Sequence, residues 1–441
     1  MKKQDSLFKS GSLAILQRGL EFLFGFGGFY LLVRILSKED FGSWVLYVTL
    51  SMIFEMAKAG FLQNGLIMHL VRAEDSDYAQ ILSSAWFLNA LVGVLSILLL
   101  AILAHPLAVM WSLPNFPQLV FIMALLQMPM ILFIQSNIVL QAHMDFASIL
   151  RISLFRQGSF FLMIVGLWLT KTQITIQHLA WLQFIITCFA SLYSFYLTKI
   201  YWRPLVKLNK AWTLKLFHYG KFVLGTNLAS TLNSSLDKFI LGALLSPVQV
   251  ATSNVATRLL NFIEVPINSI ATVVFPKSAE KVANEGPESL KKLFEESVGI
   301  MLSMTIPFFI VLLVFAPWVV SIVAGDQYSD AIQFLRIILV LALLKPYDRQ
   351  SGVFLDALGK PQINLMSVLF SLSTTVALSW ILITGYGLMG AAWALSISVF
   401  LTVILKQVLL HRYLKTSFFN SIKAALFAYP KIWVLIRTKL R

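Results

Sequence analysis

The chain alternates about twelve long apolar runs with short turn segments, and this alternation constrains the fold more than any other feature. A helix that crosses a bilayer needs about 20 mainly apolar residues, because its backbone polar groups must be satisfied within the segment. Each run is about that long or longer. We therefore expect about twelve membrane-spanning helices, at 11–33, 41–60, 79–105, 117–140, 148–170, 175–197, 214–241, 248–275, 292–323, 331–355, 362–384 and 387–410.

The composition excludes a soluble protein of this size. The 441 residues are 58% hydrophobic and 12% charged, with a mean hydropathy of +0.79, whereas a soluble domain carries roughly 25% charged residues. One aqueous core cannot hide that much apolar surface. The net charge of +15 would suit a nucleic-acid partner. Basic residues in short loops between apolar spans are instead the topology signal of membrane proteins, so no nucleic acid is expected.

The basic residues predict the orientation of the chain in the membrane. Lys/Arg residues concentrate on the cytoplasmic side of bacterial membrane proteins. One side of the predicted layout carries only Arg34, Lys38 and Lys171. The N terminus, the even-numbered connections and the C terminus are therefore expected in the cytoplasm, where the basic residues outside the tail are Lys2, Lys3, Lys9, Arg72, Arg151, Arg156, Lys199, Arg203, Lys207, Lys210, Lys215, Lys277, Lys281, Lys291, Lys292, Lys345, Arg349 and Lys360.

The two ends of the chain differ from an ordinary span. The first apolar run is too long for a cleaved signal and contains Arg18 and Glu21, so it is interpreted as a retained span. The last apolar stretch is short and is interrupted by Lys423, Pro430 and Lys431. A basic amphipathic segment on the inner leaflet is therefore expected for residues 411–441, with a thirteenth span as the alternative.

Two short echoes indicate an internal duplication. Leu36-Ser37 matches Leu245-Ser246 after the first and seventh spans, and Leu140-Gln141-Ala142 matches Leu355-Asp356-Ala357 after the fourth and tenth. With six spans in each half, this predicts a parallel repeat about an axis along the membrane normal. The expected domains are a six-helix lobe at 1–197, a basic cytoplasmic linker at 198–213, a six-helix lobe at 214–410 and the tail at 411–441.

Polar residues inside the apolar runs gather in the first two helices of each predicted lobe. Such residues are costly in lipid and usually face a cavity or a partner helix. At about 100° per residue each set shares one helix face. The sets are Arg18 and Glu21 in the first span, Glu55 and Lys58 in the second, Asn227 and Asp237 in the seventh, and Asn254, Arg258, Asn261 and Glu264 in the eighth.

Structural interpretations of these charges remain open. Arg18 with Glu21, and Glu55 with Lys58, are spaced to neutralise each other within one helix. Asp237 lies near a span end, where it can sit at the membrane interface. Glu264 is expected near mid-membrane. A role in lining a cavity is therefore the preferred interpretation for Arg258 and Glu264.

Other chemistry is not indicated. The Gly-x-x-x-x-Gly-Lys-Ser/Thr loop of nucleotide motors is absent, and the histidines have no metal-ligand spacing. The single cysteine, Cys188, permits neither an intrachain disulfide nor a zinc cluster. We therefore expect no metal, no cofactor and no enzymatic activity.

The turn motifs resemble those of a known family. RILSKEDFG at 34–42 fits the pattern R-x-L-S/T-x-x-D/E-F/Y-G, and Asp237 to Gly242 fits D-x-x-x-L-G. These motifs, with the span number and orientation, resemble the Wzx-type polysaccharide flippases of the multidrug/oligosaccharidyl-lipid/polysaccharide exporter superfamily. The resemblance implies an all-α polytopic protein of the MATE-like fold, with two six-helix lobes around a central cavity lined by spans one, two, seven and eight.

The resemblance also implies a function. The family moves an undecaprenyl-diphosphate-linked oligosaccharide from the cytoplasmic to the outer leaflet of the bacterial inner membrane. Related lipid II flippases carry cavity arginines that meet the diphosphate, and by analogy the cationic candidates here are Arg18, Lys58 and Arg258. Amide side chains are expected to bond sugar hydroxyls, and acidic ones to couple transport to a proton or sodium gradient. The residues concerned are Asn227, Asn254 and Asn261 for the sugars, and Glu21, Asp237 and Glu264 for the ion.

Two other functions are alternatives to this one. A multidrug or small-metabolite exporter of the same superfamily is the alternative, although a net-basic lining suits an anionic head group better. A glycan polymerase or ligase needs a large extracytoplasmic loop, and the predicted outer connections are short. The implied partners are the lipid-linked oligosaccharide, membrane lipid, a polysaccharide polymerase and a chain-length regulator.

Overall fold

The computed structural model describes residues 2–172, 174–204 and 206–439, and no strand occurs in that part of the chain. The all-α prediction is therefore confirmed. Five residues lie outside the described part. Residues 1 and 173 belong to the predicted N-terminal lobe, residue 205 to the predicted linker and residues 440–441 to the predicted tail. The side chains of Lys2, Lys3 and Lys9 also lie outside the described part.

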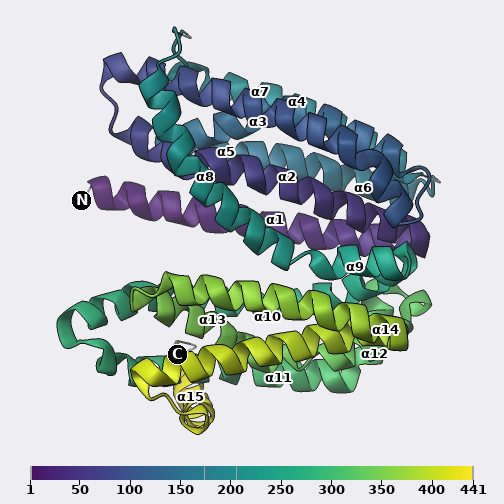
Figure 1. Ribbon diagram of the computed structural model, residues 1–441, viewed down its shortest axis with the longest axis vertical. Coiled ribbons are helices and arrows are strands. Elements are labelled where there is room, and N and C mark those ends of the chain that lie inside the picture. The colour runs from purple at the N-terminus through teal and green to yellow at the C-terminus, as the bar shows by residue number, and fades with distance from the viewer. Residues whose placement is uncertain (1, 173, 205, 440–441) are drawn as a thin grey trace. The chain divides into compact units, whose positions relative to one another are not determined.

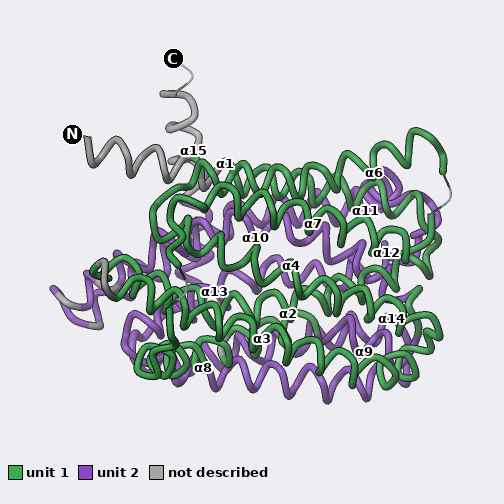
Figure 2. The backbone as a smooth tube through the Cα atoms, turned by 90° about the horizontal axis from the view of Figure 1, so that it is seen from above, with its two compact units in different colours: residues 1–235, 246–248 green, residues 236–245, 249–441 purple. Residues whose placement is uncertain are grey.

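The chain forms two compact units, shown in green and purple in Figure 2. Unit 1 comprises residues 1–235 and 246–248, and unit 2 comprises residues 236–245 and 249–441. Both consist of long, roughly aligned helices (Figure 1). Each unit is described on its own below.

Unit 1 contains eight α-helices, and two short irregular helices, among its described residues. Buried aliphatic side chains of α2, α3 and α4 form its core, among them Leu66, Leu82 and Leu126. The helices are α1 (Lys2–Ile35), α2 (Lys38–Val71), α3 (Asp75–Met110), α4 (Phe116–Ala142), α5 (Phe146–Ser153), the π-helical turn η1 (Leu154–Gly158), α6 (Ser159–Leu169), α7 (Ile176–Thr198), the 3₁₀ turn η2 (Lys199–Tyr201) and α8 (Lys210–Asn233).

Polar side chains at the turns set where these helices begin. Ser37 caps α2 by accepting a hydrogen bond from the Asp40 backbone N–H at 3.0 Å. Asp145 caps α5 through Ser148 N–H, also at 3.0 Å. Such caps satisfy donors that the first helical turn leaves unpaired. Helix α10 likewise begins directly after Ser246, so both copies of the Leu-Ser echo precede a helix start.

Unit 2 holds the remaining helices. Its described core includes Phe294, Phe334 and Phe354, each almost completely buried. The helices are α9 (Leu236–Leu244), α10 (Pro247–Glu285, whose first two residues belong to unit 1), the 3₁₀ turn η3 (Pro287–Ser289), α11 (Leu290–Ala324), the 3₁₀ turn η4 (Asp326–Tyr328), α12 (Asp330–Ile338), α13 (Leu341–Ala357), α14 (Pro361–Leu414) and α15 (Phe418–Lys439).

Helix α14 accounts for two predicted spans. Its 54 residues would extend about 80 Å as one straight helix, far beyond the ~30 Å hydrocarbon core. The chain reverses at Gly387, where φ is 55° and ψ is −134°. A Cβ on Gly390 would stand 1.9 Å from the Leu382 carbonyl oxygen, so the two arms meet closely near the turn. The two arms correspond to the predicted spans 362–384 and 387–410.

Each predicted span coincides with one helix or with consecutive helices. Eight described helices are long and apolar enough to cross a membrane by length and composition, and α14 counts once among them. Three spans are interrupted in ways the sequence analysis did not predict. The fifth contains the π turn η1, the seventh breaks between Asn233 and Leu236, and the tenth breaks between Ile338 and Leu341.

Helix α8 packs in unit 1, although the sequence analysis assigned its residues to the second lobe from 214 onward. The reason is close contact with α2. A Cβ on Gly220 would lie 2.3 Å from the Phe61 carbonyl oxygen, and one on Gly65 would lie 3.0 Å from the Tyr219 ring. The compact units therefore divide the chain at a different place from the linker 198–213, and the repeat itself stays a prediction.

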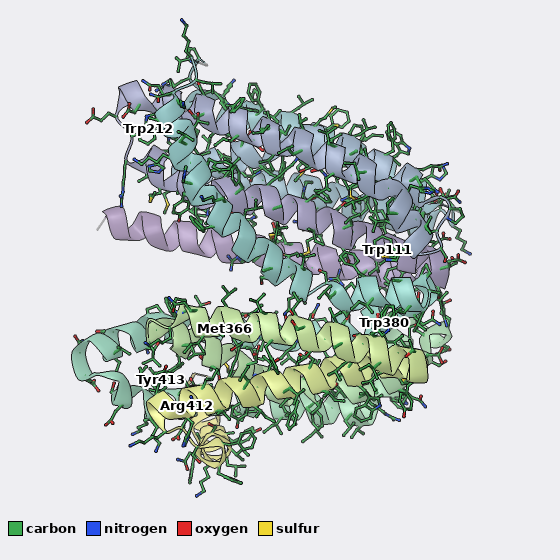
Figure 3. The ribbon with its side chains drawn as sticks, viewed as in Figure 1. Trp111, Trp212, Met366, Trp380, Arg412 and Tyr413 are labelled. Carbon is green, nitrogen blue, oxygen red and sulfur yellow. The ribbon has the colours of Figure 1, made fainter. Side chains whose placement is uncertain are left out.

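Two tryptophans mark opposite ends of unit 1 (Figure 3). Trp111 closes α3 and packs edge-on against Phe116 at 4.9 Å between ring centroids. Trp212 lies in the first turn of α8, with Lys215 Nζ 4.5 Å from its ring centroid. Figure 3 shows these two tryptophans at opposite ends of the unit.

The tail forms a helix that crosses the other helices of unit 2. In Figure 1, α15 is seen nearly end-on, whereas α10 and α14 run across the view. Glu295 of α11 accepts hydrogen bonds from Ser417 N–H at 2.9 Å and from the Asn420 amide at 3.2 Å. A Cβ on Gly299 would come within 2.6 Å of Ala424 Cβ. The start of α15 is thus held on α11, and its position on the inner leaflet stays a prediction.

Candidate functional site

The predicted cation Lys58 is completely buried within unit 1. Its side chain is 0% exposed, and Nζ donates a hydrogen bond to the Gln127 carbonyl oxygen of α4 at 3.2 Å. Glu55, one turn earlier on α2, forms its ion pair with Arg156 of η1, at 3.7 Å between Nη2 and Oε2. Lys58 therefore connects α2 to α4, and Glu55 connects α2 to η1.

On α1, Arg18 and Glu21 have different surroundings. Arg18 is exposed on the helix surface, and Glu21 is half-buried. Gln17 Nε2 donates to Glu21 Oε1 at 3.0 Å and to Ser153 Oγ at 2.9 Å, so this amide joins α1 to the end of α5. Glu21 consequently belongs to a contact between helices, and Arg18 presents its guanidinium outside that contact.

Asn227 lies where α8 approaches α2. A Cβ on Gly60 would stand 2.1 Å from Asn227 Nδ2, so the amide occupies the space that a side chain at position 60 would need. Asn227 is half-buried. Asp237 and Lys238 begin α9, and their side chains form an ion pair at 3.4 Å. The motif carboxylate is therefore neutralised by its own neighbour in sequence.

The stripe on α10 becomes more exposed along the helix. Asn254 is 7% exposed, Arg258 is half-buried and Asn261 is exposed. Residues at these spacings share one helix face. The stripe therefore offers a guanidinium and a neighbouring amide, one turn apart, that solvent or a ligand can reach.

Glu264 continues this stripe and contacts Lys345 of α13 in an ion pair. The two side chains are 43% and 26% exposed. From the sequence, Lys345 and Arg156 are both expected among the basic residues of the cytoplasmic side. The structure places both within helices that overlap predicted spans, at 331–355 and 148–170, and gives each an acidic partner on another helix.

A further ion pair, with a buried lysine, was not predicted from the sequence. Lys406 of α14 is 5% exposed and donates to Asp348 Oδ1 of α13 at 2.7 Å. Next to it, Gln407 Nε2 donates to Ser351 Oγ at 2.8 Å. The signal available in the sequence was a lone lysine and a lone aspartate in different spans. Spacing within one helix cannot reveal a pair of that kind.

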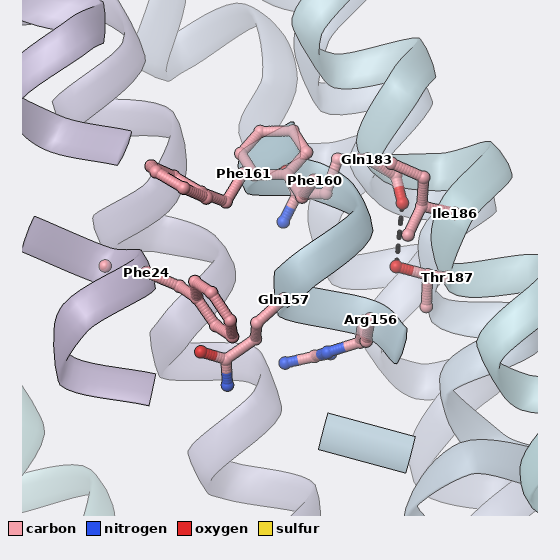
Figure 4. Close-up of a pocket in the computed structure, with 9 residues that line it drawn as sticks. Phe24, Arg156, Gln157, Phe160, Phe161, Gln183, Ile186 and Thr187 are labelled. Carbon is pink, nitrogen blue, oxygen red and sulfur yellow. Dashed lines mark hydrogen bonds between the residues drawn. The ribbon is translucent and has the colours of Figure 1, made fainter. Parts of the chain in front are cut away.

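Unit 1 also contains a pocket lined by α1, η1, α6 and α7, shown in Figure 4. Its volume is about 140 Å³. Arg156, Gln157 and Gln183 supply its polar groups, and Phe24 and Phe161 supply apolar walls. These residues come from three separate predicted spans, so no local sequence pattern connects them.

A family model described as "Polysaccharide biosynthesis protein" matches residues 31–333. The chain belongs to this family. The match includes both turn motifs, at 34–42 and 237–242, and the stripe on α10. The protein is a multi-pass membrane protein, as its long apolar helices and its membrane-transporter relatives indicate.

Curated relatives are distant in sequence. A probable low-salt glycan biosynthesis flippase of Haloferax volcanii is 24% identical over 190 residues, which are 43% of this chain and 40% of the relative. A putative O-antigen transporter of Shigella flexneri is 24% identical over 194 residues, or 44% of this chain and 46% of the relative. These alignments thus span less than half of either relative. A teichuronic acid biosynthesis protein of Bacillus subtilis is 22% identical, covering 82% of this chain and 74% of the relative.

Solved structures share the fold. An inward-facing multidrug transporter of the MATE family superimposes with a TM-score of 0.75 at 14% identity, covering 89% of this chain and 94% of the transporter. The lipid II flippase MurJ, in an inward closed conformation, gives a TM-score of 0.74, also at 14% identity, covering 96% and 92%. The protein therefore has the helical fold that these transporters share, as the sequence analysis predicted.

Proposed function

We propose that the protein is a flippase that carries an undecaprenyl-diphosphate-linked oligosaccharide from the cytoplasmic to the outer leaflet of the bacterial inner membrane. The observation that carries the proposal is the family match across residues 31–333 of a chain with a transporter fold. The names of the two relatives from Haloferax volcanii and Shigella flexneri support it, since one is a probable glycan flippase and the other a putative O-antigen transporter.

The surroundings of each cation decide which of them would meet the diphosphate. Lys58 is buried and bonded to a backbone carbonyl, so binding a ligand would first require breaking that contact. Arg18 is exposed and Arg258 is half-buried. A guanidinium also matches phosphate oxygens in a bidentate fork. In the proposed mechanism Arg18 and Arg258 attract the diphosphate, and Lys58 holds α2 against α4.

The amides have corresponding roles. Asn261 is the exposed amide one turn from Arg258, so it is assigned to sugar hydroxyls close to the diphosphate. Asn254 and Asn227 are more enclosed, and in this mechanism they become available only when their helices move. Transport by alternating access supplies such movement, as in transporters built from repeats.

Ion coupling is assigned to acidic groups whose partners can be exchanged. Glu264 contacts Lys345, and Asp237 contacts Lys238. Protonation, or a bound sodium ion, would release the lysine in either pair; for Glu264 and Lys345 this would also break a contact between α10 and α13. Glu21, bonded to Gln17, would act in the same way between α1 and α5.

The fold alone does not choose between a glycan flippase and a multidrug or small-metabolite exporter. The TM-scores of 0.75 to the multidrug transporter and 0.74 to the lipid II flippase are practically equal. The family description favours the glycan, because it names polysaccharide biosynthesis. A strain lacking the protein should therefore lose surface glycan while keeping its drug susceptibility. Normal glycan with new drug sensitivity would favour the exporter.

The proposed orientation has both termini in the cytoplasm, with a polysaccharide polymerase and a chain-length regulator as partners. A reporter enzyme that works only in the cytoplasm should then be active when it is fused after Lys207. A periplasmic signal there would overturn the orientation.

The test of the mechanism compares two arginines. Arg258→Ala should abolish surface glycan at an unchanged level of protein in the membrane, because the diphosphate loses a guanidinium in a medium of low dielectric constant. The matched control is Arg336→Ala, since Arg336 is exposed on α12 and outside the stripe. Glycan on the surface and protein in the membrane fraction are quantified together. Normal display by Arg258→Ala removes this residue from the mechanism.

A further inference from the structure

The pocket of unit 1 lies at membrane depth. Phe24 precedes the end of α1 at Ile35 by eleven residues, or about 17 Å along the helix, and Gln183 follows the start of α7 at Ile176 by about 10 Å. Both helix ends are on the predicted outer side. A hydrocarbon core of about 30 Å therefore surrounds the pocket. Polar groups at this depth are costly unless something binds them.

The polar groups of the pocket come from a distorted helix. Arg156 and Gln157 are consecutive residues of the π-helical turn η1, and π turns recur at functional sites. Figure 4 shows Gln157 and Phe24 pointing toward one another, with Arg156 directed into the same space. The π turn thus places a guanidinium and an amide on the pocket side of the helix.

Gln183 adds an acceptor whose partner is missing from the described part of the chain. Its Oε1 atom is buried and has no hydrogen-bond partner among the described residues. Buried side-chain oxygens are rarely left in that state, because an acceptor removed from water without a partner destabilises the fold. The pocket beside this atom can hold a ligand that donates a hydrogen bond to it.

The charge of the pocket favours a neutral ligand. The Arg156 guanidinium is 3.7 Å from the Glu55 carboxylate, lies 4.6 Å from the Phe133 ring centroid and donates weakly to Met130 Sδ at 3.5 Å. Its positive charge is therefore already compensated. A phosphate would have to compete with Glu55 and would meet that carboxylate at close range, so the diphosphate is a poor match here.

The size and walls of the pocket favour a single ring. At about 140 Å³ it is smaller than the roughly 300–1,000 Å³ of a site for a drug-sized ligand. Phe24 and Phe161, with ring centroids 5.6 Å apart, provide apolar surface. A sugar ring combines apolar C–H faces with hydroxyls that both donate and accept hydrogen bonds. The aromatic walls can pack against the C–H faces, and the two amides and the guanidinium can form hydrogen bonds with the hydroxyls.

We infer that this pocket binds one neutral sugar ring of the lipid-linked oligosaccharide, at a site separate from the groups assigned to the diphosphate. The inference rests on the proposed function, because it takes the glycan as the cargo. Gln183 Oε1 accepts from a hydroxyl of the ring, Gln157 and Arg156 donate to its oxygens, and Phe24 and Phe161 contact its carbon faces. The site thereby selects among glycans by shape, independently of the diphosphate that all of them carry.

Gly25 allows the pocket to be filled without disturbing the fold. It lines the pocket, and a Cβ built on it meets nothing within 4 Å. Gly25→Leu should therefore occupy the space that the sugar needs. Gly166 of α6 is the matched control, since it is also open within 4 Å and does not line the pocket. Gln183→Leu is a second variant, which removes the unpaired acceptor at nearly constant volume.

The experiment measures binding of two probes to the purified full-length protein by native mass spectrometry. One probe is the lipid-linked oligosaccharide fraction extracted from the source organism, and the other is undecaprenyl diphosphate without sugar. Gly25→Leu should bind the first at least about tenfold more weakly, and Gln183→Leu about fivefold, as expected for losing a ring contact and one hydrogen bond. Both variants should bind the sugar-free lipid as the wild type does, and Gly166→Leu should bind both probes normally.

Each other outcome overturns a specific statement. Unchanged binding of the glycan lipid by both pocket variants would show that the pocket holds water or lipid instead of sugar. Equal weakening of both probes would show a general effect on the lobe and would also reject the sugar site. If the wild type binds neither probe, the proposed function itself fails. If it binds both and only Arg258→Ala weakens them, the flippase proposal stands and the pocket is excluded.

Discussion

Lys58 in unit 1 and Arg258 in unit 2 both belong to the second helix of a predicted repeat, yet the chain uses them differently. Lys58 is 0% exposed and bonded to the Gln127 carbonyl oxygen. Arg258 is half-buried, one turn before the exposed Asn261 on the same helix face. Lys58 connects two helices of unit 1. Arg258 is more exposed than Lys58, and only under the proposed function does it meet the cargo. A charge inside a membrane helix is therefore not by itself a binding residue.

The largest effect is expected at Lys58. Lys58→Ala leaves a cavity between α2 and α4 and should destabilise the protein by about 2–5 kcal/mol, lowering its level in the membrane. Lys58→Met keeps the volume and removes the charge, so it should cost less than about 1.5 kcal/mol. Abundance and surface glycan are measured for both variants. If Lys58→Met is present at the normal level but displays no glycan, Lys58 contacts the cargo. The proposed difference between Lys58 and Arg258 is then wrong.

The ion pair between Glu55 and Arg156 should show the next largest effect. Both side chains are about one quarter exposed, so the coupling between them is expected to be only about 1 kcal/mol. Thermal unfolding in detergent is compared for Glu55→Gln, Arg156→Gln and the double variant. The double variant should lose less stability than the two single variants together. Strict additivity would mean that the pair does not hold α2 to η1.

The pair between Glu264 and Lys345 should matter less for stability than its counterpart in unit 1. Glu264 is 43% exposed, so solvent weakens the interaction. Glu264→Gln should shift the unfolding midpoint less than Glu55→Gln does. If the pair responds to an ion gradient, Glu264→Gln should also slow glycan export. Export is followed with and without a protonophore. A larger loss of stability at Glu264 than at Glu55 would reverse the comparison.

The smallest effect on stability is expected at Asn261, the exposed amide of the stripe. Asn261→Ala should change the unfolding free energy by no more than about 0.5 kcal/mol, as is usual for exposed positions. Asn254→Ala, at a site 7% exposed, should cost more. If Asn261 bonds sugar hydroxyls, Asn261→Ala still lowers the amount of displayed glycan. Full display with unchanged stability would show that Asn261 has no part in transport.

The sequence predicted the helices well because length and apolarity decide membrane spans directly. Each predicted range coincides with one or more helices, and the reversal at Gly387 falls at the predicted boundary between the spans 362–384 and 387–410. The interruptions were not predictable. Leu154–Gly158 has no proline and only a terminal glycine, so nothing local in its sequence indicates a π turn.

The candidate site was less predictable, because its partners lie on different helices. Glu55 is spaced to pair with Lys58 on its own helix, but it pairs with Arg156, a hundred residues away. The same holds for Glu264 with Lys345 and for Asp348 with Lys406. Helix periodicity shows which residues share a face, whereas packing decides what that face meets. The membership of α8 in unit 1 has the same origin.

The most direct test of the central claim is the leaflet in which the lipid-linked oligosaccharide resides. Cells depleted of the protein are treated with a membrane-impermeant reagent that oxidises sugars, and the modified fraction of the lipid-linked oligosaccharide is measured by mass spectrometry. The flippase account predicts that this fraction falls sharply on depletion and recovers when the wild-type chain, but not Arg258→Ala, is restored. An unchanged modified fraction in depleted cells would contradict the account.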